Sequence, residues 1–457
     1  MSVEDPVDRR RSLPAVDRVV ADSRLRALES LYGRPALVIQ ARAALAGLRA
    51  ELEAGLDERE LDRRIGALPD RIALLLESTY GAPLRRVVNA TGVFLHTNLG
   101  RAPLPAAVAR RLAELATAGV DLEFDLATGR RADRNARAAR RLAALTGAED
   151  ALIANNNAAA LLLALAAHAG GGEVVVSRGE LVEIGGSFRI PEILAAAGAR
   201  LVEVGTTNRT RLADYERAIG PATALLLKVL PSNYRMTGFV EAVDAASLAG
   251  LARDRGLVSV VDEGSGLLRP TTHAALADHP SMATLIAAGA DLVCGSGDKV
   301  AGGPQAGLLV GRRLAIARCR SHPLYRALRP DRLTYAALEE ILRLHLAEAA
   351  LPLERLFVEP HDHRRRLAAL AAALGAEIVP AEAFLGGGSA PERPIPGEAL
   401  AWPGDERLLA RLRSGEPPIV GYLRDGRLVL DLRTVDPADD AAVAAAVARE
   451  LAMEPTR

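Results

Sequence analysis

Seven short apolar runs alternate with longer alanine- and leucine-rich stretches over residues 86–320, and this alternation limits the folds open to the chain. Each run is four to six residues long, which suits a strand buried on both faces. Most of the stretches between the runs have the length and spacing of helices. Strands that alternate with helices indicate a mostly parallel sheet covered on both sides. The runs are residues 151–154, 173–176, 200–204, 224–229, 257–261, 291–294 and 306–310.

Helical patterns precede this α/β region. Apolar residues recur at helical spacing three times, and glycines separate the segments. Residues 1–50 contain nine arginines against six acidic residues, so the front of this region is mildly basic. The three segments are residues 13–31, 36–56 and 61–76.

A helix after Pro330 is expected to connect the α/β region to a smaller α+β region. That last region contains a hairpin over 418–432, which we expect to turn at Asp425-Gly426. The sequence therefore predicts three domains: 1–85, 86–330 and 331–457.

The composition excludes several classes of protein. Lys plus Arg and Asp plus Glu both number 57, so the net charge gives no support for overall attraction to DNA or to an anionic membrane. No uncharged apolar stretch reaches 18 residues, and the first residues have no apolar core of a signal peptide, so we expect neither membrane spanning nor secretion. Two cysteines exclude a disulfide framework and fit the cytoplasm. The string His361-Asp362-His363 has no third ligand nearby, so we expect a surface turn and no metal site.

Lysine is unusually rare, since 55 of the 57 basic residues are arginine. Arginine stays protonated and forms no Schiff base, so lysine chemistry has two candidates, Lys228 and Lys299. Lys228 lies inside an apolar strand. Lys299 lies in a glycine-rich segment, 295–305, directly after a buried strand, where small residues let a cofactor approach the backbone. Lysine binds pyridoxal phosphate (PLP) covalently, so we favour Lys299 as the PLP-binding residue.

Two further elements have the spacing of a PLP site. Asp262 ends the strand 257–261, where an acid can pair with the pyridine nitrogen of PLP, although a turn residue would fit there too. Asn155, Asn156 and Asn157 open a helix after the strand 151–154, and its free N–H groups suit a phosphate, although simple capping is the alternative. The order phosphate loop, Asp, Lys over about 140 residues matches the fold-type-I PLP enzymes, which resemble aspartate aminotransferase.

Longer motifs resemble one family, the bacterial selenocysteine synthases or L-seryl-tRNA(Sec) selenium transferases. The resemblance runs along nearly the whole chain, from Leu13–Asp17 to Gly386–Ser389, and departs from the family at Val300-Ala301, where a bulkier pair is usual. The motifs are Arg86–Leu104, Ser177–Pro191 and Ser296–Lys299 with Gly302–Gly307.

The resemblance implies the reaction and the partners. Family members convert seryl-tRNA(Sec) to selenocysteinyl-tRNA(Sec) with selenophosphate, by PLP-dependent β-elimination of the serine hydroxyl and addition of selenium. It implies that Lys299 moves the α-proton and that Asp262 keeps the pyridine nitrogen protonated. It also implies an N-terminal domain that contacts tRNA and a homo-oligomer, typically a decamer of five dimers.

The resemblance also assigns further site residues. Ser296 joins Lys299, Asp262 and the three asparagines at the cofactor. Arg101, Arg326 and Arg329 are implied to bind selenophosphate, and the last two could face one way if their stretch is helical. For His96 both an active-site contact and a satisfied core position stay open.

Two alternatives are weighed against this interpretation. One is a PLP-dependent lyase acting on a small amino acid or amino-sugar acid without tRNA, against which the region 1–85 argues. The other is a regulator with a DNA-binding region and a ligand-sensing domain. That alternative requires a basic recognition helix, but the basic string Arg9–Arg11 precedes the helices. The presence of both Lys299 and Asp262 favours catalysis and no DNA partner.

Overall fold

The computed structural model describes residues 13–81, 84–184, 188–231, 234–357, 360–389 and 393–452. The string Arg9–Arg11 and the motif residues Gly185–Ser187 lie outside the described residues. The chain divides into two compact units, Met1–Arg86 and Val87–Arg457, and each is described by itself.

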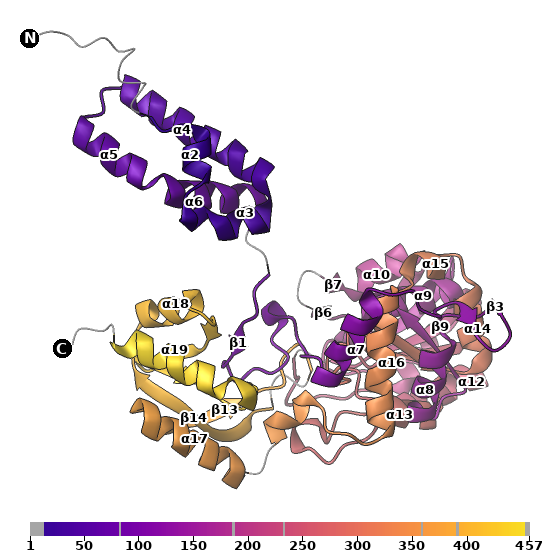
Figure 1. Ribbon diagram of the computed structural model, residues 1–457. Helices are drawn as coiled ribbons and strands as arrows, with labels where there is room; N and C mark the ends of the chain where they lie inside the picture. The colour runs from indigo at the N-terminus through magenta and orange to yellow at the C-terminus, as the bar shows by residue number, and fades with distance from the viewer. Residues whose placement is uncertain are drawn as a thin grey trace, which may run out of the picture. The chain divides into compact units, whose positions relative to one another are not determined.

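The N-terminal unit is helical, as the sequence predicts (Figure 1). Leu37 and Leu48 of one helix pack with Ile72 and Leu76 of another to form a core of its own. Asp57 caps helix α5 (Glu58–Gly66) by accepting a hydrogen bond of 2.8 Å from the Glu60 N–H. The elements are α2 (Val16–Val20), η2 (Ser23–Leu25), α3 (Arg26–Tyr32), α4 (Arg34–Glu53), α5 (Glu58–Gly66) and α6 (Leu68–Tyr80).

A seven-stranded sheet forms the centre of the second unit, and every apolar run of the sequence supplies one strand. Its order is β4-β12-β11-β10-β9-β5-β8, and β12 runs opposite to the other six strands of this sheet. The mostly parallel α/β fold is therefore confirmed. The strands are β4 (Asp150–Ala154), β5 (Glu173–Ser177), β8 (Arg200–Val204), β9 (Thr223–Val229), β10 (Val258–Asp262), β11 (Leu292–Ser296) and β12 (Gly307–Gly311).

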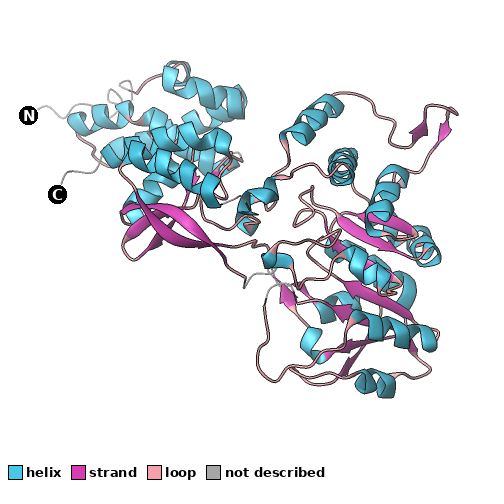
Figure 2. Ribbon diagram, turned by 90° about the horizontal axis from the view of Figure 1, so that it is seen from below, coloured by secondary structure: helices cyan, strands magenta, loops and turns pink. Residues whose placement is uncertain are grey.

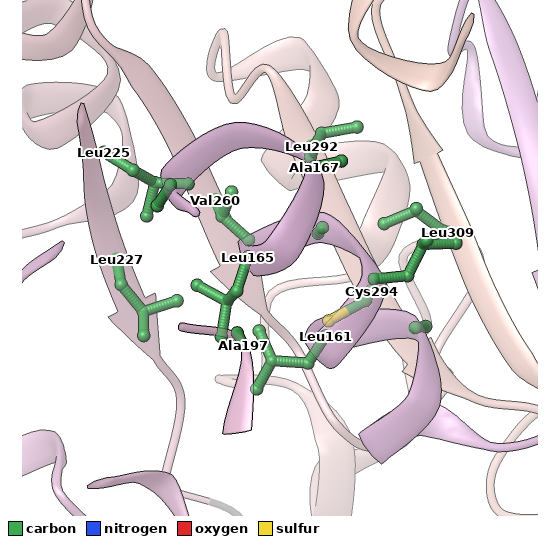
Figure 3. Close-up of a cluster of buried hydrophobic side chains, with 14 of the residues drawn as sticks. Leu161, Leu165, Ala167, Ala197, Leu225, Leu227, Val260, Leu292, Cys294 and Leu309 are labelled. Carbon is green, nitrogen blue, oxygen red and sulfur yellow. The ribbon is translucent and has the colours of Figure 1, made fainter. Parts of the chain in front are cut away.

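Helices cover both faces of this sheet, and Figure 2 shows its strands lying between them. The first face packs against α9 (Asn157–Ala169), α10 (Ile190–Ala196), α14 (Arg313–Ser321) and α15 (Leu324–Leu328). Figure 3 shows the apolar cluster beneath α9, which includes Leu161, Val260 and Cys294. The second face packs against α8 (Ala136–Thr146), α11 (Leu212–Ala218), α12 (Ala245–Asp254), α13 (Met282–Ala287) and α16 (Arg332–Leu346).

Short elements connect these layers. They are β1 (Val88–Asn89), η3 (Thr97–Leu99), α7 (Ala106–Ala116), β2 (Phe124–Asp125), β3 (Arg130–Arg131), η4 (Arg178–Glu180), β6 (Glu183–Ile184), β7 (Phe188–Arg189) and η5 (Ala274–Leu276). The expected connecting helix after Pro330 is α16, and it packs against α7 and α8.

The C-terminal part is an antiparallel sheet, β13-β14-β17-β16, with helices packed beside it. The expected hairpin turns at Asp425 and Gly426, which both have positive φ. The early segment Ala90–Leu95 packs against this C-terminal part, because the Phe94 and Leu95 N–H groups donate to the Phe384 and Leu385 carbonyls. The elements are η6 (Pro352–Phe357), α17 (Pro360–Leu374), β13 (Glu377–Ala383), β14 (Ile395–Pro403), α18 (Glu406–Ser414), β15 (Ile419–Val420), β16 (Tyr422–Arg424), β17 (Arg427–Leu430), η7 (Pro437–Asp439) and α19 (Asp440–Ala452).

The surface turn expected at His361-Asp362-His363 is wrong. These residues lie in the first turn and a half of α17, with His361 exposed and His363 buried. His363 Nε2 is bonded to the Glu398 carbonyl at 2.9 Å, so it helps to fix α17 on β14. Within the described ranges no three His, Cys, Asp or Glu side chains are grouped as metal ligands. Across the same ranges no helix is long and apolar enough to cross a bilayer.

Candidate active site

Asp262 lies at the carboxyl end of β10, in the middle of the sheet, and is buried. Its Oδ1 accepts a hydrogen bond of 2.8 Å from Asn157 Nδ2 and one of 3.5 Å from the Cys294 thiol. Burial raises the pKa of Asp262, while the Asn157 hydrogen bond and the charge of Lys299 oppose that rise. No ion pair reaches this carboxylate from any described residue.

Lys299 lies in the loop between β11 and β12, at the same edge of the sheet as Asp262. Its Nζ donates to the Gly264 carbonyl at 3.1 Å, and the side chain is buried. Burial lowers the pKa of Lys299, the Arg101 charge lowers it further, and the Asp262 charge opposes both. A larger share of neutral amine follows, which is the form that attacks a carbonyl or takes a proton.

The backbone around Lys299 is packed too closely for side chains. Gly266 has φ +76°, and a Cβ there would lie 1.9 Å from the Ser296 carbonyl oxygen. Ser296 itself ends β11 and is buried. Close contact of the 264–266 turn with Ser296 fixes the path of the loop that bears Lys299.

Lys228, the other lysine, is bound in a buried ion pair. Its Nζ lies 2.8 Å from Glu180 Oε1, and Glu180 Oε2 accepts from the Val229 N–H at 2.9 Å. The pair lines a pocket of about 280 Å³, away from the Lys299 loop. A lysine held this way is not free to bind a cofactor, which agrees with the preference for Lys299.

The three asparagines have separate places in the structure. Asn156 caps α9, because its Oδ1 accepts from the Ala159 N–H at 2.8 Å. Asn157 donates to Asp262 instead of pointing to a phosphate, and its own Oδ1 is buried with no partner among the described residues. The Asn155 side chain is exposed, and its N–H donates to the Leu328 carbonyl at 2.8 Å. A phosphate bound here would therefore have to use the backbone N–H groups that open α9.

The arginines lie on two segments. Arg101 forms an ion pair of 2.8 Å with Asp298, the residue before Lys299, and has a left-handed φ of 63°. Arg326 is exposed on α15, and Arg329 follows the end of that helix, so the two are not on one helical face. Arg329 follows Leu328, whose carbonyl holds Asn155, and therefore lies beside the expected phosphate loop. Its Nη1 lies 3.7 Å from Glu123 Oε1, while its Nε is buried and has no partner within the described residues.

His96 lies in the segment that leads from Leu95 to Arg101. Its Nδ1 is buried with no hydrogen-bond partner among the described residues, so the structure shows no satisfied core histidine here.

Sequence reasoning missed a second buried acid, Glu263. It is fully buried and accepts hydrogen bonds from the Gly266 N–H at 2.6 Å, from Ser265 and from His279 Nε2 at 2.8 Å if that nitrogen is protonated. It also missed the Arg101–Asp298 pair and the thiol of Cys294. The adjacent acids Asp262-Glu263 after a strand were the available signal, since successive strand residues point to opposite faces.

The site fits the chemistry of PLP. Among the described residues the buried Asp262 carboxylate has only neutral hydrogen-bond donors, and a protonated pyridine nitrogen would supply a cation in direct contact. A buried lysine with a lowered pKa lies at the same sheet edge. Asp262 and Lys299 would therefore hold the ring nitrogen and the aldehyde carbon respectively.

Comparison with known proteins decides the family. A family model described as L-seryl-tRNA selenium transferase matches residues 87–436, and one described as selenocysteine synthase N terminal matches residues 10–49. The chain belongs to the L-seryl-tRNA(Sec) selenium transferase family. This family consists of PLP-dependent enzymes of fold type I, as the sheet order and the site chemistry also indicate.

Relatives of that name match along almost the whole chain. The Geobacter sulfurreducens protein is 42% identical, covering 96% of this chain and 98% of its own. The Solidesulfovibrio magneticus protein is 43% identical over 94% and 95%, and an Escherichia coli protein is 44% identical over 93% and 95%. Among solved structures, D-glucosaminate-6-phosphate ammonia-lyase aligns with a TM-score of 0.58 at 23% identity, over 82% of this chain and 97% of that one, which is a likeness of fold.

Proposed function

We propose that this chain converts seryl-tRNA(Sec) to selenocysteinyl-tRNA(Sec), with Lys299 and Asp262 as its principal catalytic residues. The observation that supports these roles most directly is the contrast between the two lysines. Glu180 balances the charge of Lys228 in a buried ion pair, whereas Lys299 lies at the same sheet edge as Asp262, whose carboxylate has no ion pair with any described residue. Family membership supports the substrate.

The residues divide the work as follows. PLP, when bound, supplies an electron sink that makes the α-proton of the seryl group acidic. Asp262 pairs with the ring nitrogen and keeps it protonated. Lys299 anchors the cofactor, takes the α-proton on Nζ and returns it at the end. The Gly264 carbonyl, 3.1 Å from Nζ, holds the amine in place between these steps.

We assign the selenium donor, selenophosphate, to the three arginines. Arg101 forms an ion pair with Asp298, the residue directly before Lys299, which places its side chain near the cofactor lysine. The buried Nε of Arg329 is a hydrogen-bond donor that an anion could use. We further propose that the N-terminal helical unit binds the tRNA, that the enzyme is a homo-oligomer, in line with the expected decamer, and that it acts in the cytoplasm, where aminoacyl-tRNA is found.

Selenium transfer tests the reaction, and cofactor trapping tests the site. The purified protein should transfer radioactive selenium from selenophosphate to seryl-tRNA(Sec), and no transfer would refute the function. Borohydride reduction followed by peptide mapping should place the cofactor on Lys299. An adduct on Lys228 would overturn the site assignment without touching the function.

A further inference from the structure

We propose that Cys294 and Asn157 are positioning residues that hold the Asp262 carboxylate by its Oδ1 oxygen and leave Oδ2 to the ring nitrogen of PLP. This inference rests on the role of Asp262 proposed above. Both side chains act through Asp262, and neither is assigned contact with a reacting atom.

Three elements converge on a single oxygen atom. Asp262 and Cys294 are direct neighbours in the register of β10 and β11. Cys294 belongs to the cluster beneath α9 in Figure 3, and Asn157 is the first residue of α9. Asn157 Nδ2 and Cys294 Sγ lie 2.8 Å and 3.5 Å from Asp262 Oδ1. Oδ2 forms no hydrogen bond with any described residue, so it is the oxygen left for a ligand.

The thiol is suited to this role because it can only donate here. Burial among apolar side chains raises the pKa of Cys294 well above its usual value, so the sulfur keeps its proton. A protonated thiol is a weak donor to the carboxylate oxygen. Two donors on Oδ1 stabilise the ionised carboxylate in a site where burial favours the neutral acid. An ionised Asp262 is the form that pairs with a protonated ring nitrogen.

The second cysteine of the chain provides a matched control. Cys319 on α14 is fully buried in the same apolar cluster as Cys294. Replacing either by alanine removes one sulfur atom from the same core, but only Cys294 touches Asp262. Any difference between the two variants in cofactor binding therefore reports on the contact with Asp262, and any shared loss of stability reports on packing.

The experiment compares the full-length holoenzyme with Cys294→Ala, Cys294→Ser, Cys319→Ala and Asn157→Ala. Loss of one weak donor should raise the PLP dissociation constant of Cys294→Ala about 3- to 10-fold. It should also raise the pH midpoint of the visible absorption band, because a less protonated ring repels the proton on the Lys299 nitrogen less. Cys294→Ser, which keeps a donor, should stay within about 2-fold of the parent.

The remaining variants make the result decisive. Asn157→Ala, which removes the shorter hydrogen bond, should change the same two quantities in the same direction. Cys319→Ala should lose thermal stability comparably to Cys294→Ala while keeping the parent's affinity and pH midpoint. Equal PLP affinity and equal pH midpoint in the two alanine variants of cysteine would overturn the inference. If Asp262→Asn also leaves both quantities unchanged, the proposed role of Asp262 fails instead.

Discussion

At the scale of single residues, the two buried lysines differ in their partners: one is ion-paired and the other has no ion pair among the described residues. Lys228 and Glu180 neutralise one another inside the protein, so removing one partner leaves a buried charge. Lys299 has no such partner within hydrogen-bonding distance among the described residues, since its Nζ contacts the Gly264 carbonyl. One lysine is therefore held in a buried ion pair, and the other is the one left for the proposed chemistry.

Replacing the two lysines one at a time should separate an effect on protein stability from an effect on cofactor binding. Lys228→Met should lower the free energy of unfolding by about 3 kcal/mol, because Glu180 is left unpaired, and should keep the yellow colour of bound PLP. Lys299→Ala should change unfolding much less and lose the covalently bound cofactor. Urea unfolding and visible absorbance measure both effects. A colourless Lys228→Met variant of normal stability would contradict this division.

Replacing Arg329 should weaken the binding of selenophosphate more than replacing an exposed surface arginine does. Its buried Nε lacks a partner in the described part of the chain, so an anion there would gain a charge-assisted contact. Arg329→Ala should raise the selenophosphate KM by about 10- to 100-fold, which corresponds to the loss of one such hydrogen bond. The exposed Arg318 on α14 offers a control. Equal KM values for Arg329→Ala and Arg318→Ala would remove Arg329 from the donor site.

At the scale of elements, strand β12 joins the sheet to the expected phosphate loop. A Cβ on Gly307 would lie 2.1 Å from the Asn156 carbonyl oxygen, and Asn156 begins the turn into α9. Gly311, at the other end of the same strand, is equally crowded, since its Cβ would lie 2.1 Å from the Asp291 carbonyl oxygen. The two glycines are therefore equally crowded positions at opposite ends of β12, so one can serve as the control for the other.

Alanine at these two positions should have different effects on the cofactor. Both Gly307→Ala and Gly311→Ala should destabilise the protein by about 1–3 kcal/mol, since backbone must shift in each. Gly307→Ala alone should also weaken PLP binding, about 10-fold or more, because the loop before α9 moves. Thermal unfolding and PLP titration are the measurements. Equal loss of PLP affinity in both variants would show that the effect comes from general destabilisation.

Helix α17 should make stability depend on pH through His363. Burial lowers the pKa of His363, and the charge of Asp431 opposes this while those of Arg433 and Arg366 reinforce it. The unfolded chain therefore binds the proton more readily, and stability is lost as the pH falls through the unfolded value of about 6.5. His363→Gln should reduce the loss between about pH 7 and pH 5, and exposed His361→Gln should not. Urea unfolding at both pH values measures the loss of stability. If His363→Gln and His361→Gln lose the same stability between these pH values, His363 is not the group responsible.

The elements also show what sequence can and cannot predict. The strands were predictable because each is a short apolar run. The rarity of lysine made Lys299 a candidate, and its role at the cofactor stays a prediction. Asn157 was placed at a phosphate by its position after β4, yet its amide turns to Asp262. That choice depends on the register of β10 beside β11 and on where α9 begins, which no local pattern encodes. The helical run at His361–His363 was missed because two histidines and an acid looked like a turn.

At the scale of the whole molecule, the chain consists of two units with separate cores. The core of the first unit, with Leu37, Leu48 and Ile72, includes no residue beyond Arg86 among those described. Asp262 and Lys299, the residues proposed to hold PLP, both lie in the second unit. This separation agrees with the proposal that the second unit binds the cofactor and the first supplies affinity for tRNA.

Cutting the chain between the units tests this division. A protein beginning at Val87 should still bind PLP, because Asp262, Lys299 and the sheet that positions them are all present. Its affinity for seryl-tRNA(Sec) should fall by about 100-fold or more at moderate salt, since phosphate and shape contacts dominate such binding. The intact protein should lose tRNA affinity as salt rises, and the truncated one should have little left to lose. Filter binding over a salt series, with PLP absorbance as the control for folding, gives both results. A yellow truncated protein with undiminished tRNA affinity would place the tRNA surface on the second unit instead.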